Sequence, residues 1–124
     1  NCYELYPGGY VLGQREKQMD LRIIRSPSPG TLDLIKRRLG MVKDSSLDHV
    51  EAIGLVQGRM IDMVCACDLA EKATNVDAYD VRGVCPQHMT LLAIFGDTGS
   101  VEQALKEIER KLKEGMYSDY SQAN

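Results

Sequence analysis

The chain has 124 residues, a formal charge of −3, and 44% hydrophobic and 27% charged residues. This size and composition fit one globular domain, which at this length buries roughly two-thirds of the unfolded chain's surface, so its core needs no disulfide bonds. The basic residues are scattered, and no apolar run approaches the roughly 18 residues of a membrane span. We therefore expect neither nucleic acid nor a membrane as a partner.

A short β-hairpin is expected at the start of the chain, over residues 1–13. A Pro-Gly-Gly turn there separates two stretches that are rich in β-forming residues. An isolated two-stranded hairpin is marginally stable in water. This extension is therefore expected to pack on its own domain or on neighbouring copies.

A strand and a helix are expected next. Residues 21–25 form the strand, which ends at the Ser-Pro-Ser-Pro-Gly sequence of residues 26–30. Residues 31–39 carry apolar side chains at helical spacing, and Gly40 follows where a left-handed helix cap commonly lies.

The middle of the chain predicts a buried strand over residues 52–56, followed by a longer helix. Helical spacing groups five of its small or apolar side chains on one face, which we expect to be buried. They are Met60, Met63, Val64, Cys67 and Ala70.

Two further strands are predicted over residues 79–82 and 89–95, with residues 83–88 between them. A capping box of Ser100 and Gln103 then predicts a helix whose inward face extends to Leu112. The polar tail over residues 116–124 has too little apolar surface to order itself. Strands interleaved with helices favour an α+β sandwich, and periodicity alone leaves a parallel α/β fold open.

The cysteines give the clearest chemical signal. Cys85 and Pro86 lie in the loop over residues 83–88, where proline fixes the backbone and removes an amide donor, as suits a metal ligand. The alternative is a free cysteine in a tight turn. Cys65 and Cys67 are two residues apart on a helix, so they point to nearly opposite sides and are expected to be packing residues.

One chain offers too few ligands for a metal centre of its own. Cys85 and His88 make half of a zinc site, and an iron–sulfur cluster requires three or four thiolates. A cyclic oligomer that brought Cys85 of every copy to a shared axis would supply them.

Several segments together resemble the bacterial microcompartment (BMC) shell domain: residues 52–56, 65–73 and 95–105. A strand, a Pro-Gly turn and a helix precede the first of these, which resembles the circularly permuted form over residues 19–115. The resemblance implies a ferredoxin-like sandwich that forms a cyclic hexamer, with residues 1–13 as a hairpin beside the pore.

The same resemblance assigns roles to the loop and to one lysine. The loop, with Gly83, Val84, Pro86, Gln87 and His88, would line the six-fold pore. Its Gly-x-Cys-Pro-Gln sequence is similar to that of the iron–sulfur type from glycyl-radical-type microcompartments. Cys85 would then hold a [4Fe-4S] cluster shared between subunits. Lys72 matches the lysine that reaches a neighbouring hexamer across the tile edge.

These inferences predict a structural, redox-linked subunit and no enzyme. Homo-hexamers would tile a microcompartment shell in the cytoplasm together with other shell proteins, and the cluster would transfer or sense electrons. A cluster-free tile whose Cys85 narrows the pore is one alternative. A thiol enzyme with Cys85 as nucleophile and His88 as base is another.

Overall fold

The computed structural model describes residues 19–81 and 89–113. In chain order its elements are β1 (Asp20–Arg25), α2 (Pro29–Leu39), the 3-10 turn η1 (Ser45–Leu47), β2 (Ala52–Arg59), α3 (Met60–Ala73), β3 (Asp77–Val81), β4 (Met89–Gly96), α4 (Thr98–Ile108) and the π-helical turn η2 (Glu109–Lys113). The predicted strands and helices of this part are confirmed, with β3 two residues earlier at its start. The hairpin predicted over residues 1–13 and the tail over residues 116–124 lie outside the described residues.

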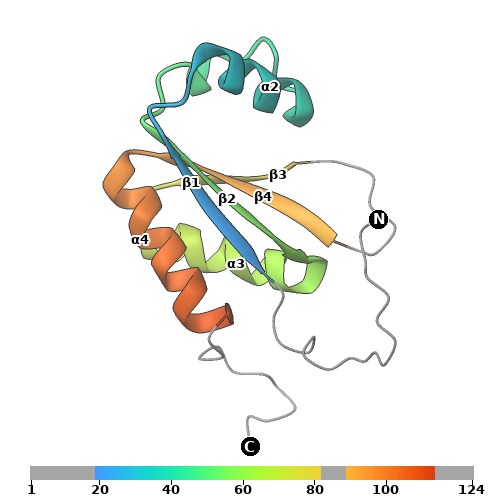
Figure 1. Cartoon of the computed structure of the whole chain (residues 1–124), viewed down its shortest axis with the longest axis vertical. Helices are drawn as coiled ribbons and strands as arrows, with labels where there is room; N and C mark the ends of the chain where they lie inside the picture. Colours follow the sequence, from blue (N-terminus) through green and yellow to red (C-terminus); the bar gives the residue numbers. More distant parts are fainter. Residues whose placement is uncertain (1–18, 82–88, 114–124) are drawn as a thin grey trace, which may run out of the picture.

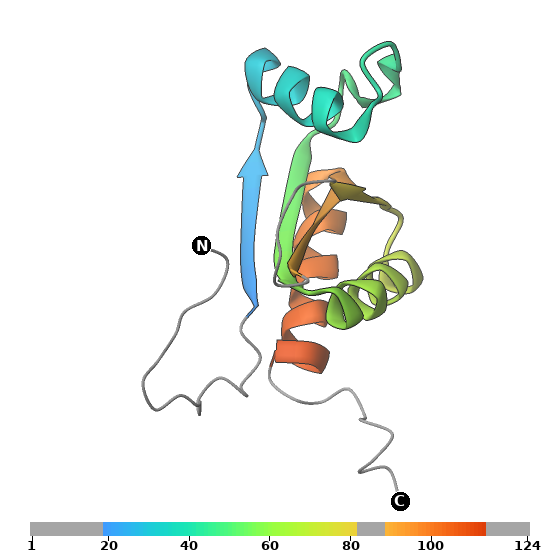
Figure 2. The same ribbon diagram turned by 90° about the vertical axis from the view of Figure 1, so that its right-hand side faces the viewer.

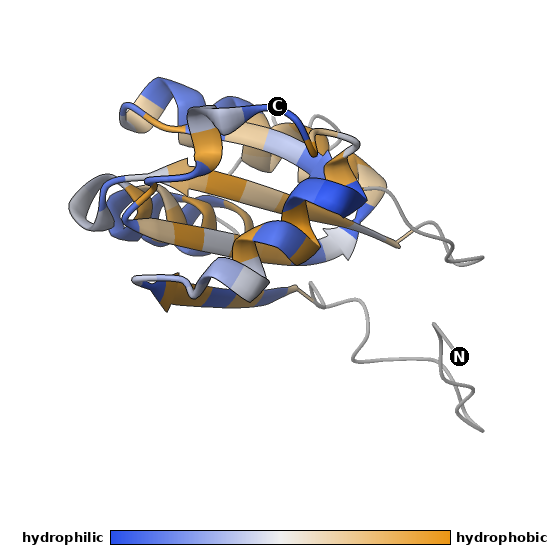
Figure 3. Cartoon of the chain, turned by 90° about the horizontal axis from the view of Figure 1, so that it is seen from above, coloured by the Kyte–Doolittle hydropathy of each residue, from blue (hydrophilic) through white to orange (hydrophobic). Residues whose placement is uncertain are grey.

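The strands form one sheet in the order β1-β2-β4-β3. Each neighbouring pair is antiparallel, which confirms the α+β class and excludes the parallel alternative. β2 and β4 occupy the centre, with Ile53 opposite Phe95 and Val56 opposite Leu92. Figure 3 shows β1 at the edge alternating between hydrophobic and hydrophilic residues, as a half-exposed strand does.

Helices cover both faces of the sheet. α3 and α4 lie side by side on one face (Figures 1 and 2), where Val56 and Ile94 join the larger hydrophobic cluster. α2 lies across one end of the sheet, where its Leu32 and Ile35 meet Ile53 and other side chains of the opposite face. Alternate residues of β2 and β4 thus belong to two separate clusters, because successive side chains of a strand point to opposite faces.

Local capping explains where α2 begins and ends. The Ser28 hydroxyl accepts a hydrogen bond from the backbone N–H of Thr31, and Pro29 occupies the first turn. The helix ends at Gly40, whose φ of 72° is the left-handed conformation predicted for it. Lys36, buried on α2, donates to Asp48 Oδ1 at 2.7 Å and so ties the helix to the segment after η1.

The predicted cap of α4 is wrong. Asp97 is the N-cap, and its carboxylate accepts hydrogen bonds from the Ser100 backbone N–H at 2.8 Å and from the Ser100 hydroxyl at 3.0 Å. Ser100 lies inside the helix and donates where we expected it to accept. Aspartate and serine are equally good N-caps, so residue type alone does not choose between them. β4 ends at Gly96, directly before Asp97, and the helix begins directly after it, at Thr98.

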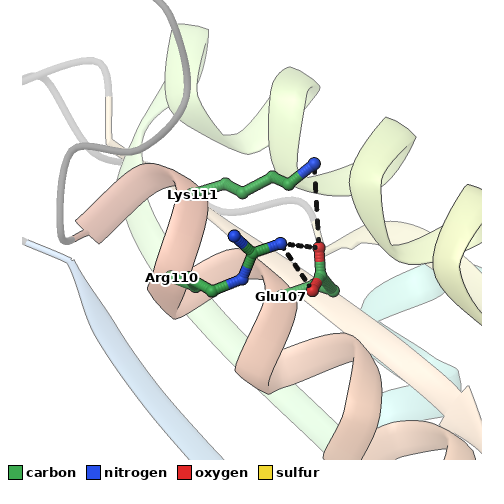
Figure 4. A network of polar contacts seen from close by, with 3 residues as sticks. All are labelled: Glu107, Arg110 and Lys111. Carbon is green, nitrogen blue, oxygen red and sulfur yellow. Dashed lines mark hydrogen bonds and ion pairs between the residues drawn. The ribbon is translucent and has the colours of Figure 1, made fainter.

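A local charge network joins the end of α4 to η2 (Figure 4). The Glu107 carboxylate accepts two hydrogen bonds from the Arg110 guanidinium, each 3.0 Å long, and pairs with Lys111 Nζ at 3.9 Å. Spacings of three and four residues place these side chains on one side of the helix. One carboxylate thus faces two basic groups near the end of α4, and the network keeps a net positive charge.

We predict that Gly54→Ala destabilises the fold by about 1–3 kcal/mol. A Cβ atom at Gly54 would lie 3.0 Å from Val101 Cγ1 and 3.3 Å from both Leu105 Cδ atoms, so α4 would have to move away from β2. Urea denaturation measures the change. Gly30→Ala is the control, since a Cβ there meets nothing within 4 Å and alanine favours a helix; equal stabilities for the two variants would contradict this packing.

We also predict that Asp48→Asn lowers the free energy of unfolding by about 1–2 kcal/mol. The substitution leaves the ammonium group of Lys36, whose side chain is 10% exposed, without its carboxylate. Lys36→Met should cost less, because it removes the buried charge together with its need for a partner. Thermal unfolding of both variants tests this, and a more harmful Lys36→Met would reverse the interpretation.

Candidate functional site at the β3–β4 end of the sheet

The predicted cluster ligand lies between two strands that the structure describes. Cys85 and the other predicted pore residues, Gly83, Val84, Pro86, Gln87 and His88, lie outside the described residues. The chain enters this segment after Val81 and returns at Met89. Because Val81 pairs with Leu91, both ends of the segment are held at one end of the sheet.

The start of α3 lies at the same end. Met89 pairs with Arg59, the last residue of β2, and α3 begins directly after it at Met60. β1 also begins here, with Asp20 opposite Gln57, whereas α2 lies at the other end (Figure 1). A side-chain hydrogen bond of 2.9 Å from the Thr90 hydroxyl to Asp80 Oδ1 further joins the two strands that flank the segment.

A groove of about 450 Å³ runs between α3 and the β3–β4 pair. Its floor and walls are mostly apolar, and carboxylates and one hydroxyl complete the lining. The apolar residues are Met60, Met63, Val64, Cys67, Ala78, Leu91 and Leu92, and the polar ones are Asp68, Glu71, Asp80 and Thr90.

The groove corrects the predicted inward face of α3. The residues that α3 buries are Met63, Ala66, Leu69 and Ala70. Met60 and Val64, which we expected in the core, are 53% and 66% exposed. Helical spacing shows which side chains share a face, but the neighbouring elements decide how much of that face they cover.

The two cysteines of α3 are suited to packing rather than to metal binding. Both are free and partly buried against the larger cluster, and Cys67 also lines the groove. Partial burial, and then the carboxylates of Glu71 and Asp68, raise the pKa of the Cys67 thiol. A metal ligand or a nucleophile needs the thiolate, which the surroundings of Cys67 disfavour. Within residues 19–81 and 89–113, no group of three or more His, Cys, Asp or Glu side chains could hold a metal ion.

Lys72 lies in the last turn of α3, and its side chain is 76% exposed. Its ammonium group lies 2.9 Å from Asp68 Oδ2, one helical turn earlier. An exposed ion pair of this kind contributes little to stability. The lysine can therefore exchange this partner for another at little cost.

The family model of the BMC domain matches residues 52–123. This chain belongs to the BMC-domain family. The match begins at β2 and continues through the flanking strands of the predicted pore segment. BMC-domain proteins form microcompartment shells, so this chain is a microcompartment shell protein. Among curated proteins, no sequence matches the chain.

Solved structures of other BMC shell proteins are similar to this one. The ligand-free GrpU shell protein from Clostridiales bacterium 1_7_47FAA is 49% identical over 78% of this chain and 95% of that chain, with a TM-score of 0.59. GrpU from Pectobacterium wasabiae is 34% identical over 73% of this chain and 99% of that one, with a TM-score of 0.57. The CutR chain, solved as a flat hexamer, is 25% identical over 81% of this chain and 82% of that chain, with a TM-score of 0.53.

The predicted cysteine loop of this BMC-domain protein lies outside the described residues, and the groove was not predicted from the sequence. One feature of the sequence could have indicated the groove. The apolar residues of α3 cover more of the helix circumference than one buried face needs, because Ile61 is apolar as well as Met60 and Val64. No helix among the described residues is long and apolar enough to cross a membrane.

We predict that Cys67 reacts several-fold more slowly with iodoacetamide at pH 8 than an unfolded cysteine does, because its raised pKa reduces the thiolate fraction. A variant with Cys2, Cys65 and Cys85 replaced by serine isolates the reaction, which mass spectrometry follows. Urea should restore the rate of a free cysteine. Equal rates in the folded and unfolded protein would contradict the protective environment.

Proposed function

We propose that this shell protein forms homo-hexamers that tile a microcompartment shell in the cytoplasm together with other shell proteins. Membership of the BMC-domain family and 49% identity to a microcompartment shell protein support this proposal. The flat hexamer of CutR is an assembly of the same kind in a protein that is 25% identical. Hexamers built this way would meet at their edges, where we place Lys72.

We further propose that the shell domain, residues 19–115, is the circularly permuted form. The family match begins at residue 52, yet β1 and α2 precede it in the chain. β1 pairs with β2 over six residues and contributes Leu21 and Ile23 to the larger cluster. A strand that completes the sheet from before the matched region is what a permuted order requires.

The central proposal is that Cys85 of several subunits holds a [4Fe-4S] cluster at the pore, as in glycyl-radical-type microcompartments. The observation that carries it is the donor set. Cys65 and Cys67 pack against the larger cluster on α3, which leaves Cys2 and Cys85. Of these two, Cys85 lies in the segment whose flanking strands, β3 and β4, are paired at the sheet end. One thiolate per chain satisfies a cluster only if copies share it around an axis. Such a cluster would supply one-electron transfer or redox sensing.

The residues around Cys85 have supporting roles in this proposal. The backbone N–H groups near Gly83 and Val84 would donate hydrogen bonds to sulfur, and His88 would be a further donor or an occasional ligand. The anchoring of both flanks, through the Val81–Leu91 pair and the Asp80–Thr90 hydrogen bond, would limit the movement of the loop. No substrate is turned over in this scheme.

The test is anaerobic reconstitution with iron and sulfide, comparing the wild type with Cys85→Ser and with Cys65→Ser/Cys67→Ser. We expect the wild type and the double variant to be brown hexamers with equal iron per hexamer. Cys85→Ser should keep the hexamer mass and lose the iron and the visible absorption.

The outcomes separate the alternatives. A colourless wild-type hexamer supports a cluster-free tile and contradicts the cluster. Iron that persists in Cys85→Ser and disappears in the double variant would move the ligand to α3. Thiol-dependent turnover by a monomer would favour the enzyme and contradict the whole proposal.

A further inference from the structure

β4 extends beyond β3 at the end of the sheet where residues 82–88 leave and return. The last Cα pair between the two strands is Val81 with Leu91, so the described part of β3 offers no pairing partner to Met89 or Thr90. β2, on the other side of β4, pairs with both of these residues. The returning strand is therefore held by β2 over its whole length, whereas the outgoing strand has fewer backbone contacts.

β3 is also the less constrained strand because it lies at the edge of the sheet. Among the described strands it pairs with β4 alone, whereas β4 lies between β2 and β3. β3 is short, with five residues from Asp77 to Val81. Elements with few partners open locally at their ends more readily than central ones do. Whatever holds the end of β3 therefore controls how the chain leaves the sheet toward Cys85.

A side-chain hydrogen bond closes this end of β3. The Thr90 hydroxyl donates to Asp80 Oδ1 over a distance of 2.9 Å. Asp80 pairs with Leu92, so Thr90 is its diagonal neighbour on the same face of β4. Thr90 lies one residue beyond the last pair of the two strands. Its hydroxyl thus joins β4 to β3 at the point where the described backbone pairing has ended.

The neighbouring charges do not replace this bond. Asp80 and Thr90 line the groove together with Asp68 and Glu71, whose carboxylates repel that of Asp80. The basic side chains nearby pair with other carboxylates, Arg59 with Asp62 at 3.6 Å and Lys72 with Asp68 at 2.9 Å. The hydrogen bond from Thr90 is therefore a specific attraction that keeps the Asp80 side chain against β4.

We infer that Thr90, acting through Asp80, is a positioning residue for Cys85. Its hydroxyl fixes the end of β3 against β4 and so limits how far the Cys85 thiolate can move from its place at the shared axis. This inference rests on the proposed cluster and specifies which described side chains keep its ligand in place. Outer groups that orient a ligand control how firmly the metal is held, so a loosened segment releases iron faster.

The test compares the release of iron to a chelator from Thr90→Val and Thr74→Val hexamers after anaerobic reconstitution. Both substitutions remove a hydroxyl and keep a β-branched side chain. The Thr74 hydroxyl donates to the Ser100 carbonyl oxygen at 3.1 Å, where α4 begins after the other end of β4. Loss of one hydrogen bond should make release from Thr90→Val about threefold to tenfold faster than from the wild type. Thr74→Val, and Thr90→Ser with its retained hydroxyl, should match the wild type.

A second measurement needs no cluster. In iron-free protein with Cys2, Cys65 and Cys67 replaced by serine, mass spectrometry follows the alkylation of Cys85 by iodoacetamide. Thr90→Val and Asp80→Ala should each accelerate it by about the same factor. The double variant should be no faster than either single variant, because both remove one shared bond. Circular dichroism and native mass spectrometry verify folding and hexamer mass.

The outcomes separate the positioning role from the cluster. A wild type that takes up no iron contradicts the cluster, whereas the alkylation of Cys85 still tests the positioning. Equal alkylation rates for Thr90→Val and the wild type overturn the inference, as do additive effects of Thr90→Val and Asp80→Ala. Equal acceleration by Thr74→Val would show a general loosening and overturn it too. If Thr90→Val fails to fold, Asp80→Ala answers the question in its place.

Discussion

The central pair of strands, β2 and β4, is the constraint on which the rest of the fold depends. Their paired residues alternate between two faces, so that Val56 and Ile94 meet α3 and α4, whereas Ile53 and Phe95 meet α2. Gly54 allows the close approach of α4, because any side chain there would contact Val101. Side chains of α2, α3 and α4 all pack against this pair. The register of β2 and β4 therefore determines which residues lie at each end of the sheet. One end carries α2, and the other receives the segment that contains Cys85.

α3 has two surfaces with different roles. Its small and apolar residues Ala66 and Ala70 are fully buried and let the helix lie close to the sheet. Met60 and Val64 remain exposed because none of the elements within residues 19–81 and 89–113 covers them. Burying such side chains in an assembly is favourable in proportion to the apolar area removed from water. A helix with too much apolar surface for its own domain is thus suited to a shell subunit.

The cysteines divide in the same way between packing and chemistry. Cys67 lies where burial and neighbouring carboxylates raise its pKa, which keeps the thiol protonated. A ligand needs the opposite surroundings, and Cys85 remains the sequence-based prediction for that role. The proposed cluster has one physical requirement, which is a ring of identical chains. A single subunit supplies too few thiolates for it.

The sequence by itself determined the local elements and the family. Alternation and helical spacing identified the strands and helices, and Gly40 marked the end of α2 because glycine adopts a positive φ at little cost. The resemblance to the BMC shell domain rested on short local segments, and the family match agrees with it. Tertiary structure alone decided that Asp97 rather than Ser100 caps α4, that the strands are antiparallel, and that Val64 is exposed. The reason is that a periodic pattern records which side chains are apolar, whereas burial depends on which distant segments come to cover them.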